Sequence, residues 1–154
     1  NSEFSGAKVL SWSMNLAWLE EAHTAGYDEM LLLDERGYVS ECTGANIFAV
    51  QGNNVWTPPL SAGCLPGITR AILLEEIRLP GITISERDMD LEELGQSDEV
   101  FITSSTRDLL RVAEVNEVPV GPQDSTRSKL AEAFLTYRKS YASRADLRYF
   151  PAVS

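Results

Sequence analysis

The sequence has few of the residues that build metal centres or disulfide frameworks. It contains one histidine and two cysteines among 154 residues. Cys42 and Cys64 stand far apart without CxxC spacing, and His23 alone cannot complete the set of about four ligands that a zinc site needs. We therefore expect no metal site and no disulfide, and we interpret the two cysteines as small buried side chains.

Long apolar runs and an excess of positive charge are also missing. No run reaches the roughly 18 apolar residues of a membrane-spanning helix, and the first residues, "NSEFSGAKVL", lack the pattern of a signal peptide. The 23 acidic residues outnumber the 13 basic ones, for a net charge of −10, and no basic stripe is present. Such a surface is unsuited to nucleic acid. These absences favour a cytoplasmic protein without a membrane or nucleic-acid partner.

The chain does hold enough apolar sequence for one folded domain, since 44% of its residues are hydrophobic. In the first half, the helical spacing of Met14, Ala17, Trp18 and Ala22 predicts an amphipathic helix over residues 13–24 that ends near Gly26. Short apolar runs then predict an antiparallel strand meander, in which "QGNN" is a hairpin turn. The strands are expected at "DEMLLLD", "YVSE", "NIFAV" and "VWT".

The second half predicts more helices and strands in alternation. A helix is expected from the "CLPG" break to about Arg78, then a strand "ITISE", a short acidic helix at "DLEELG", and a strand "EVFITSS" paired with "LLRVAEV". A C-terminal helix follows, whose apolar stripe comprises Leu130, Ala133, Phe134, Tyr137 and Tyr141. The fold class is therefore α+β, or mixed α/β.

The stretch "CLPGITR" is a candidate anion site. A proline-glycine break precedes a helix start at Gly67, Ile68 and Thr69, where backbone N–H groups have no helical partner and the helix dipole is positive. A phosphate would fit there. Many ordinary helices also begin this way, so the motif alone leaves both interpretations open.

Three other features could carry chemistry. Lys8 stands among small and apolar neighbours in "SGAKVLSW", where partial desolvation would make its amine nucleophilic. A surface lysine with a buried stem fits the same pattern. Glu41 ends the strand "GYVSE" and, if buried, would need a cationic or N–H partner. An exposed acid at the edge of a loop fits this position equally well. The cluster "TSSTRD" at 103–108 follows a strand, where loops often display function.

Together these segments resemble the C-terminal domain of the class IV, or fold type IV, aminotransferases that use pyridoxal phosphate (PLP). This family includes branched-chain and D-amino-acid aminotransferases and aminodeoxychorismate lyase. The resemblance covers roughly two thirds of the chain, and its segments keep the family's order and spacing. They are "GAKVLSWSMN", "AGYDEMLLLDERGYVSECTGANIFAV", "VWTPPLSAGCLPGITR" and "DLEELGQSDEVFITSS".

The resemblance implies a role for each matching residue. Lys8 would be the catalytic lysine that bonds to PLP and moves the substrate proton, while Glu41 would hold the pyridine nitrogen protonated. Asn46 would brace the loop that holds Glu41. The other positions would contact the cofactor or substrate: Leu65 lies against the ring, Gly67, Ile68, Thr69 and Ser105 surround the phosphate, and Thr106 lies near the substrate carboxylate.

The implied function is transamination between an amino acid and a 2-oxo acid by a homodimeric enzyme of amino acid metabolism. The family's N-terminal domain, which supplies a phosphate-binding arginine, is absent here, so the isolated piece is expected to be inactive. Branched-chain enzymes also carry a tyrosine shortly after the lysine, where this chain has Trp12. Two alternatives stay open: PLP-dependent pyruvate elimination, as in aminodeoxychorismate lyase, or a noncatalytic domain that retains the scaffold.

Overall fold

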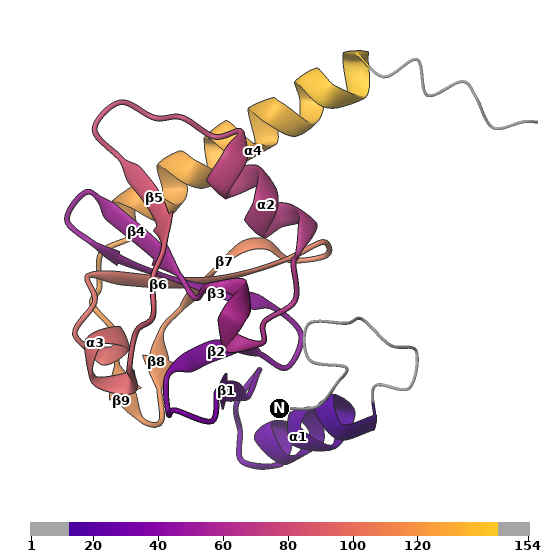
Figure 1. Cartoon of the computed structure of the whole chain (residues 1–154), viewed down its shortest axis with the longest axis vertical. Coiled ribbons are helices and arrows are strands. Elements are labelled where there is room, and N and C mark those ends of the chain that lie inside the picture. Colours follow the sequence, from indigo (N-terminus) through magenta and orange to yellow (C-terminus); the bar gives the residue numbers. More distant parts are fainter. Residues whose placement is uncertain (1–12, 145–154) are drawn as a thin grey trace, which may run out of the picture.

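The computed structural model describes residues 13–144 and shows helices on both sides of a central sheet (Figure 1). The helices are α1 (Ser13–Thr24), α2 (Ile68–Glu75), α3 (Leu91–Gly95) and α4 (Ser125–Arg144), with a 3-10 turn at Leu60–Ala62. The strands are β1 (Leu31–Leu33), β2 (Val39–Cys42), β3 (Asn46–Gln51), β4 (Asn54–Thr57), β5 (Thr83–Glu86), β6 (Glu99–Ser104), β7 (Asp108–Val112), β8 (Glu114–Val115) and β9 (Val118–Pro119).

The central sheet has five strands in the order β5-β4-β3-β6-β7. Strand β3 pairs antiparallel with β4 and β6, β6 pairs antiparallel with β7, and β5 joins β4 in parallel. The predicted "QGNN" hairpin is present, and Gly52 adopts a positive φ of 58° at its tip. Two further ribbons, β1-β2 and β8-β9, lie outside this sheet. The predicted α+β class is confirmed.

The alternation of side chains along β3 places one hydrophobic core on each face of the sheet. Phe48 and Val50 point to the core that α2 and α4 cover, where Phe48 stacks on Phe101 with ring centroids 5.0 Å apart. Ile47 and Ala49 point to the opposite core, which includes residues of β2, α3 and β6. Because adjacent strand residues face opposite sides, a single apolar strand serves both cores.

Several predicted element boundaries differ from the structure. Helix α2 ends at Glu75 instead of near Arg78, because the Ile77 N–H bonds to Ile72 O five residues back and Pro80 soon follows. The run "LLRVAEV" divides between β7 and β8. Tyr141, predicted on the packed stripe of α4, is 59% exposed because the helix extends past the sheet. In α1, Met14 is 60% exposed, so only part of the predicted stripe is covered.

The topology gathers three loops at one edge of the sheet. Asn46, the first residue of β3, pairs with Thr103 near the end of β6, so the β2-β3 turn and the β6-β7 turn lie side by side. The segment before α2 crosses the same edge, since Asn46 donates a hydrogen bond to Leu65 O. Within residues 13–144, no helix is both long and apolar enough to cross a membrane.

Candidate functional site

Glu41 is a buried carboxylate at the sheet edge. It lies in β2, with only 9% of its surface exposed, and its Oε2 accepts the Leu65 N–H at 3.0 Å. Burial raises the pKa of Glu41 to about 7, and the Leu65 hydrogen bond only partly offsets this rise. No cation among residues 13–144 forms a salt bridge with it. A buried acid in this state favours a positively charged partner.

Leu65 is held at both of its backbone polar groups. Its N–H donates to Glu41, and its carbonyl accepts from Asn46 Nδ2 at 2.8 Å. Asn46 therefore braces the segment before α2, whereas the sequence predicted that it would brace the loop holding Glu41. Gly67 completes the arrangement, because a Cβ at this position would lie 2.2 Å from Asn46 Oδ1. Only glycine leaves room for this close approach.

Helix α2 begins at the same place with an uncapped N-terminus. Gly67 is the N-cap residue, and no side chain accepts a hydrogen bond from the first turn. Thr69 is buried, whereas Ile68 is 72% exposed. The first N–H groups of a helix have no partner within it, and they lie at the positive end of its dipole. The geometry therefore permits an anion at this turn, which is one of the two interpretations of "CLPGITR" that the sequence left open.

The β6-β7 turn presents hydroxyl groups beside this region. Ser105 and Thr106 are exposed, and Ser104 Oγ lies 3.3 Å from Thr106 Oγ1 and accepts the Arg107 N–H at 3.2 Å. Thr103 is different from the other members of the cluster. It lies within β6, is buried, and its hydroxyl has no hydrogen-bond partner in the structure.

An ion pair that the sequence did not indicate connects two of the loops. The buried Glu29 side chain pairs with Arg107 of the β6-β7 turn, accepts the Thr43 hydroxyl, and accepts the Gly44 N–H at 3.0 Å. Glu29 precedes β1, so its partners are remote in sequence. No local spacing rule could have identified this contact, because it depends on the pairing of β3 with β6.

The two cysteines lie close to the site, but their thiols are expected to be unreactive. Both are buried, as predicted, and neither forms a disulfide. Burial raises the pKa of the Cys42 thiol far above its usual range and that of Cys64 to about 11. In the described part of the chain, no three His, Cys, Asp or Glu side chains gather as metal ligands would.

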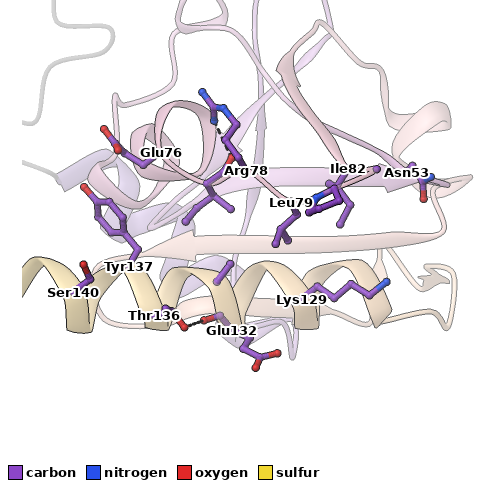
Figure 2. A pocket seen from close by; sticks show the side chains of 14 residues that line it. Asn53, Glu76, Arg78, Leu79, Ile82, Lys129, Glu132, Thr136, Tyr137 and Ser140 are labelled. Atoms are coloured by element: carbon purple, nitrogen blue, oxygen red, sulfur yellow. Dashed lines mark hydrogen bonds between the residues drawn. The ribbon is translucent and has the colours of Figure 1, made fainter.

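An open groove of about 690 Å³ lies elsewhere, between α4 and the segment that follows α2 (Figure 2). Its lining includes Arg78, Leu79, Lys129 and Tyr137. None of the predicted site residues within 13–144 lines it. The groove lies beyond the C-terminal end of α2, whereas the predicted site lies at the N-terminal end.

The structure thus brings together Glu41, the turn at residues 65–69 and the β6-β7 turn. Lys8 and Trp12 lie outside the described residues. The arrangement places the uncapped start of α2 beside a buried acid, at the edge of an α+β domain.

Comparison with known proteins identifies the class. A family model described as amino-transferase class IV matches residues 1–115, and the chain belongs to this family. The branched-chain-amino-acid aminotransferase of Salmonella typhimurium is 37% identical over 101 residues, which make up 66% of this chain and 33% of that protein.

Solved structures share the fold. The branched-chain amino acid aminotransferase from Thermobaculum terrenum, in its PLP form, has a TM-score of 0.76 and 27% identity, over 94% of this chain and 47% of that one. A provisionally named 4-amino-4-deoxychorismate lyase from Legionella pneumophila has a TM-score of 0.76 and 26% identity, over 84% of this chain and 47% of that one. The chain spans about a third of the length of the curated relatives it matches.

Proposed function

We propose that this chain is the cofactor-binding part of a PLP-dependent aminotransferase that transfers an amino group between an amino acid and a 2-oxo acid. One observation carries the proposal: a buried acid, Glu41, lies beside an uncapped helix start, and Leu65 is hydrogen-bonded to Glu41. Family membership adds the expectation that both serve one cofactor.

The residues fit PLP at both of its charged ends. A protonated ring nitrogen would provide the cation that buried Glu41 lacks among the described residues. The free N–H groups at the start of α2 suit a phosphate. Gly67, pressed against Asn46, lets the backbone approach closely. When bound, PLP supplies a ring that withdraws electrons from the substrate Cα.

Each residue then has a separate task. Lys8 would bond to the cofactor and, once released, move a proton at the substrate Cα. Glu41 would hold the ring nitrogen protonated, and Leu65 would orient the ring. Phosphate would be bound by Gly67, Ile68 and Thr69 together with the Ser105 hydroxyl, and Thr106 would lie near the substrate carboxylate.

We further propose that an N-terminal domain completes the site in the full encoded chain, and that residues 1–154 form the C-terminal domain. The short match to the curated relatives supports this view. We propose a cytoplasmic homodimer that binds neither nucleic acid nor membranes, consistent with the net charge of −10.

The decisive experiment locates the cofactor on the chain. The full encoded chain is incubated with PLP, reduced with borohydride and mapped by peptide mass spectrometry, with Lys8→Ala as the control. We expect a pyridoxyl adduct on Lys8 that is absent from the variant. An unmodified Lys8 in folded protein would reject the proposal and favour a noncatalytic domain.

Pyruvate elimination is the second candidate, because the Legionella protein shares the fold at the same TM-score as the aminotransferase. Product analysis separates the two reactions. A transaminase requires a 2-oxo acid acceptor for turnover, whereas a lyase releases pyruvate without one.

A further inference from the structure

Arg70, in the first turn of α2, is a buried cation with no role in the proposed chemistry. Only 4% of its surface is exposed. Its Nη2 donates to Pro58 O at 2.7 Å and pairs with Glu86, while its Nε has no partner in the structure. A buried guanidinium is costly unless it is paired. Its presence in a first turn therefore calls for an explanation.

The partners of Arg70 belong to the end of the parallel strand pair. Glu86 is the last residue of β5, Thr57 pairs with it at the end of β4, and Pro58 follows directly. One guanidinium therefore fastens the first turn of α2 to the place where both strands end. Arginine suits this task because its planar fork can bind a carbonyl and a carboxylate at once.

The segment just before α2 is held from the other side by β2 and β3. Glu41 and Asn46 hold Leu65 through its N–H and its carbonyl. Arg70 is the contact that holds the turn from the α2 side, and its Cβ lies 3.8 Å from where a Gly67 Cβ would be. The N–H groups of Ile68 and Thr69 lie between these two anchors.

We propose that Arg70 is a positioning residue for the phosphate-binding turn, acting through Pro58 O and Glu86 to keep the α2 N–H groups directed at the phosphate. This inference rests on the proposed function. It concerns a residue that need not touch the cofactor, and it deepens the account of how the phosphate site is preorganised.

The test compares PLP with pyridoxal, which lacks the phosphate. Dissociation constants for both are measured by absorbance titration in the full encoded chain, for the unmodified protein, Arg70→Met, Arg70→Lys and Glu86→Gln. Arg87→Lys is the matched control, because Arg87 follows Glu86 but pairs with Glu93 instead. Thermal unfolding of each variant reports on folding.

We expect Arg70→Met to weaken PLP binding about tenfold or more while pyridoxal binding changes less than about twofold. Arg70→Lys keeps the charge but not the fork, and Glu86→Gln keeps the fork but weakens its partner, so both should show the same selective loss to a smaller degree. These two milder variants decide the matter if Arg70→Met does not fold. Arg87→Lys should bind both ligands normally.

An equal loss of PLP and pyridoxal affinity in folded variants, or no loss of either, would overturn the inference and leave Arg70 a structural residue only. The unmodified protein separates this result from failure of the proposed function. If the unmodified protein does not bind PLP more tightly than pyridoxal, the proposed phosphate site is rejected, and the proposed role of Arg70 is rejected with it.

Discussion

At the scale of single residues, Glu41 has the clearest energetic signature. Its carboxylate is buried at the sheet edge, and its one described hydrogen bond comes from the Leu65 N–H. The protonated form is therefore favoured in the folded chain without cofactor, with a pKa of about 7. A carboxyl group with a raised pKa stabilises the folded state at low pH, and this contribution is lost as the pH rises.

We expect the cofactor-free protein to lose stability as the pH rises from about 4.5 to about 7, by roughly 3 kcal/mol from this one group. Glu41→Gln should remove that slope, because the amide stays neutral, and should make the protein more stable than the unmodified chain above pH 7. Urea unfolding at pH 5, 6, 7 and 8 measures both effects. Glu132→Gln, at an exposed site on α4, is the control. Parallel slopes for Glu41→Gln and the unmodified chain would contradict the assignment.

Candidate site residues could be identified from the sequence where their signal is local. Glu41 ends a strand, and Gly67 to Thr69 begin a helix after a proline-glycine break, so each position has a short-range signal. Glu29 and Arg70 have none. Their partners lie at Arg107 and Glu86, and those distances become short only after the strands have paired.

At the scale of elements, helix α4 depends on a capping group supplied by the sheet. Glu99, the first residue of β6, is 2% exposed, and its two carboxylate oxygens accept the N–H groups of Thr126 and Arg127 at 2.8 Å each. These are first-turn donors that would otherwise be unpaired. The carboxylate also opposes the positive end of the helix dipole.

We expect Glu99→Ala to cost about 2–4 kcal/mol of unfolding free energy, because it leaves one buried and one partly buried N–H donor unpaired. Glu99→Gln keeps the shape but only one acceptor oxygen, so its cost should be about half as large. Denaturant unfolding measures the cost, and hydrogen exchange should show the loss concentrated at residues 126–128. Glu132→Ala, on the exposed face of the same helix, should change stability little. An equally small effect of Glu99→Ala would contradict the capping role.

The spacing of apolar residues predicted which helices and strands form better than it predicted where each one begins and ends. The stripe through Leu130, Phe134 and Tyr137 placed α4 on its core, because the period of the pattern matches the period of the helix. The start at Ser125 is stabilised by Glu99 from a distant strand, and the end of α2 depends on how the chain turns toward Pro80. Such boundaries depend on tertiary contacts that no local pattern encodes.

At the scale of the whole molecule, the sheet topology was the least predictable feature. The antiparallel β3-β4 hairpin follows from sequence order and a tight turn. The predicted four-strand meander is only partly correct, because β1 and β2 form a separate ribbon. The parallel pairing of β5 with β4 requires α2 to cross over between them, and no residue pattern in "ITISE" specifies that neighbour. The same crossover brings the helix start to the sheet edge, so the site depends on the part of the topology that the sequence revealed least.

The parts of the molecule also differ in local stability, as α1 and β3 show. Helix α1 has 12 residues, about the length at which an isolated helix is marginal. Only Ala22 within it is buried, and Asn15 Nδ2 donates to Thr43 O at 3.1 Å. Leu16 is 55% exposed. Strand β3, in contrast, is buried on both faces at the centre of the sheet.

We therefore expect amides of α1 to exchange through local opening, at a free energy at least about 2 kcal/mol below that of β3. Asn15→Ala should lower the exchange free energy of α1 by about a further 1 kcal/mol and leave that of β3 unchanged. Met14→Ala, which removes an exposed side chain, should not lower the exchange free energy of α1.

PLP should raise the protection of α1 against exchange, because Lys8 precedes the helix closely and a covalent bond there would restrain it. Native-state hydrogen exchange, with and without PLP, measures the exchange free energies of α1 and β3 in the unmodified protein and in both variants. Equal exchange free energies for α1 and β3 would contradict the layered stability, and protection of α1 that PLP leaves unchanged would count against the role of Lys8.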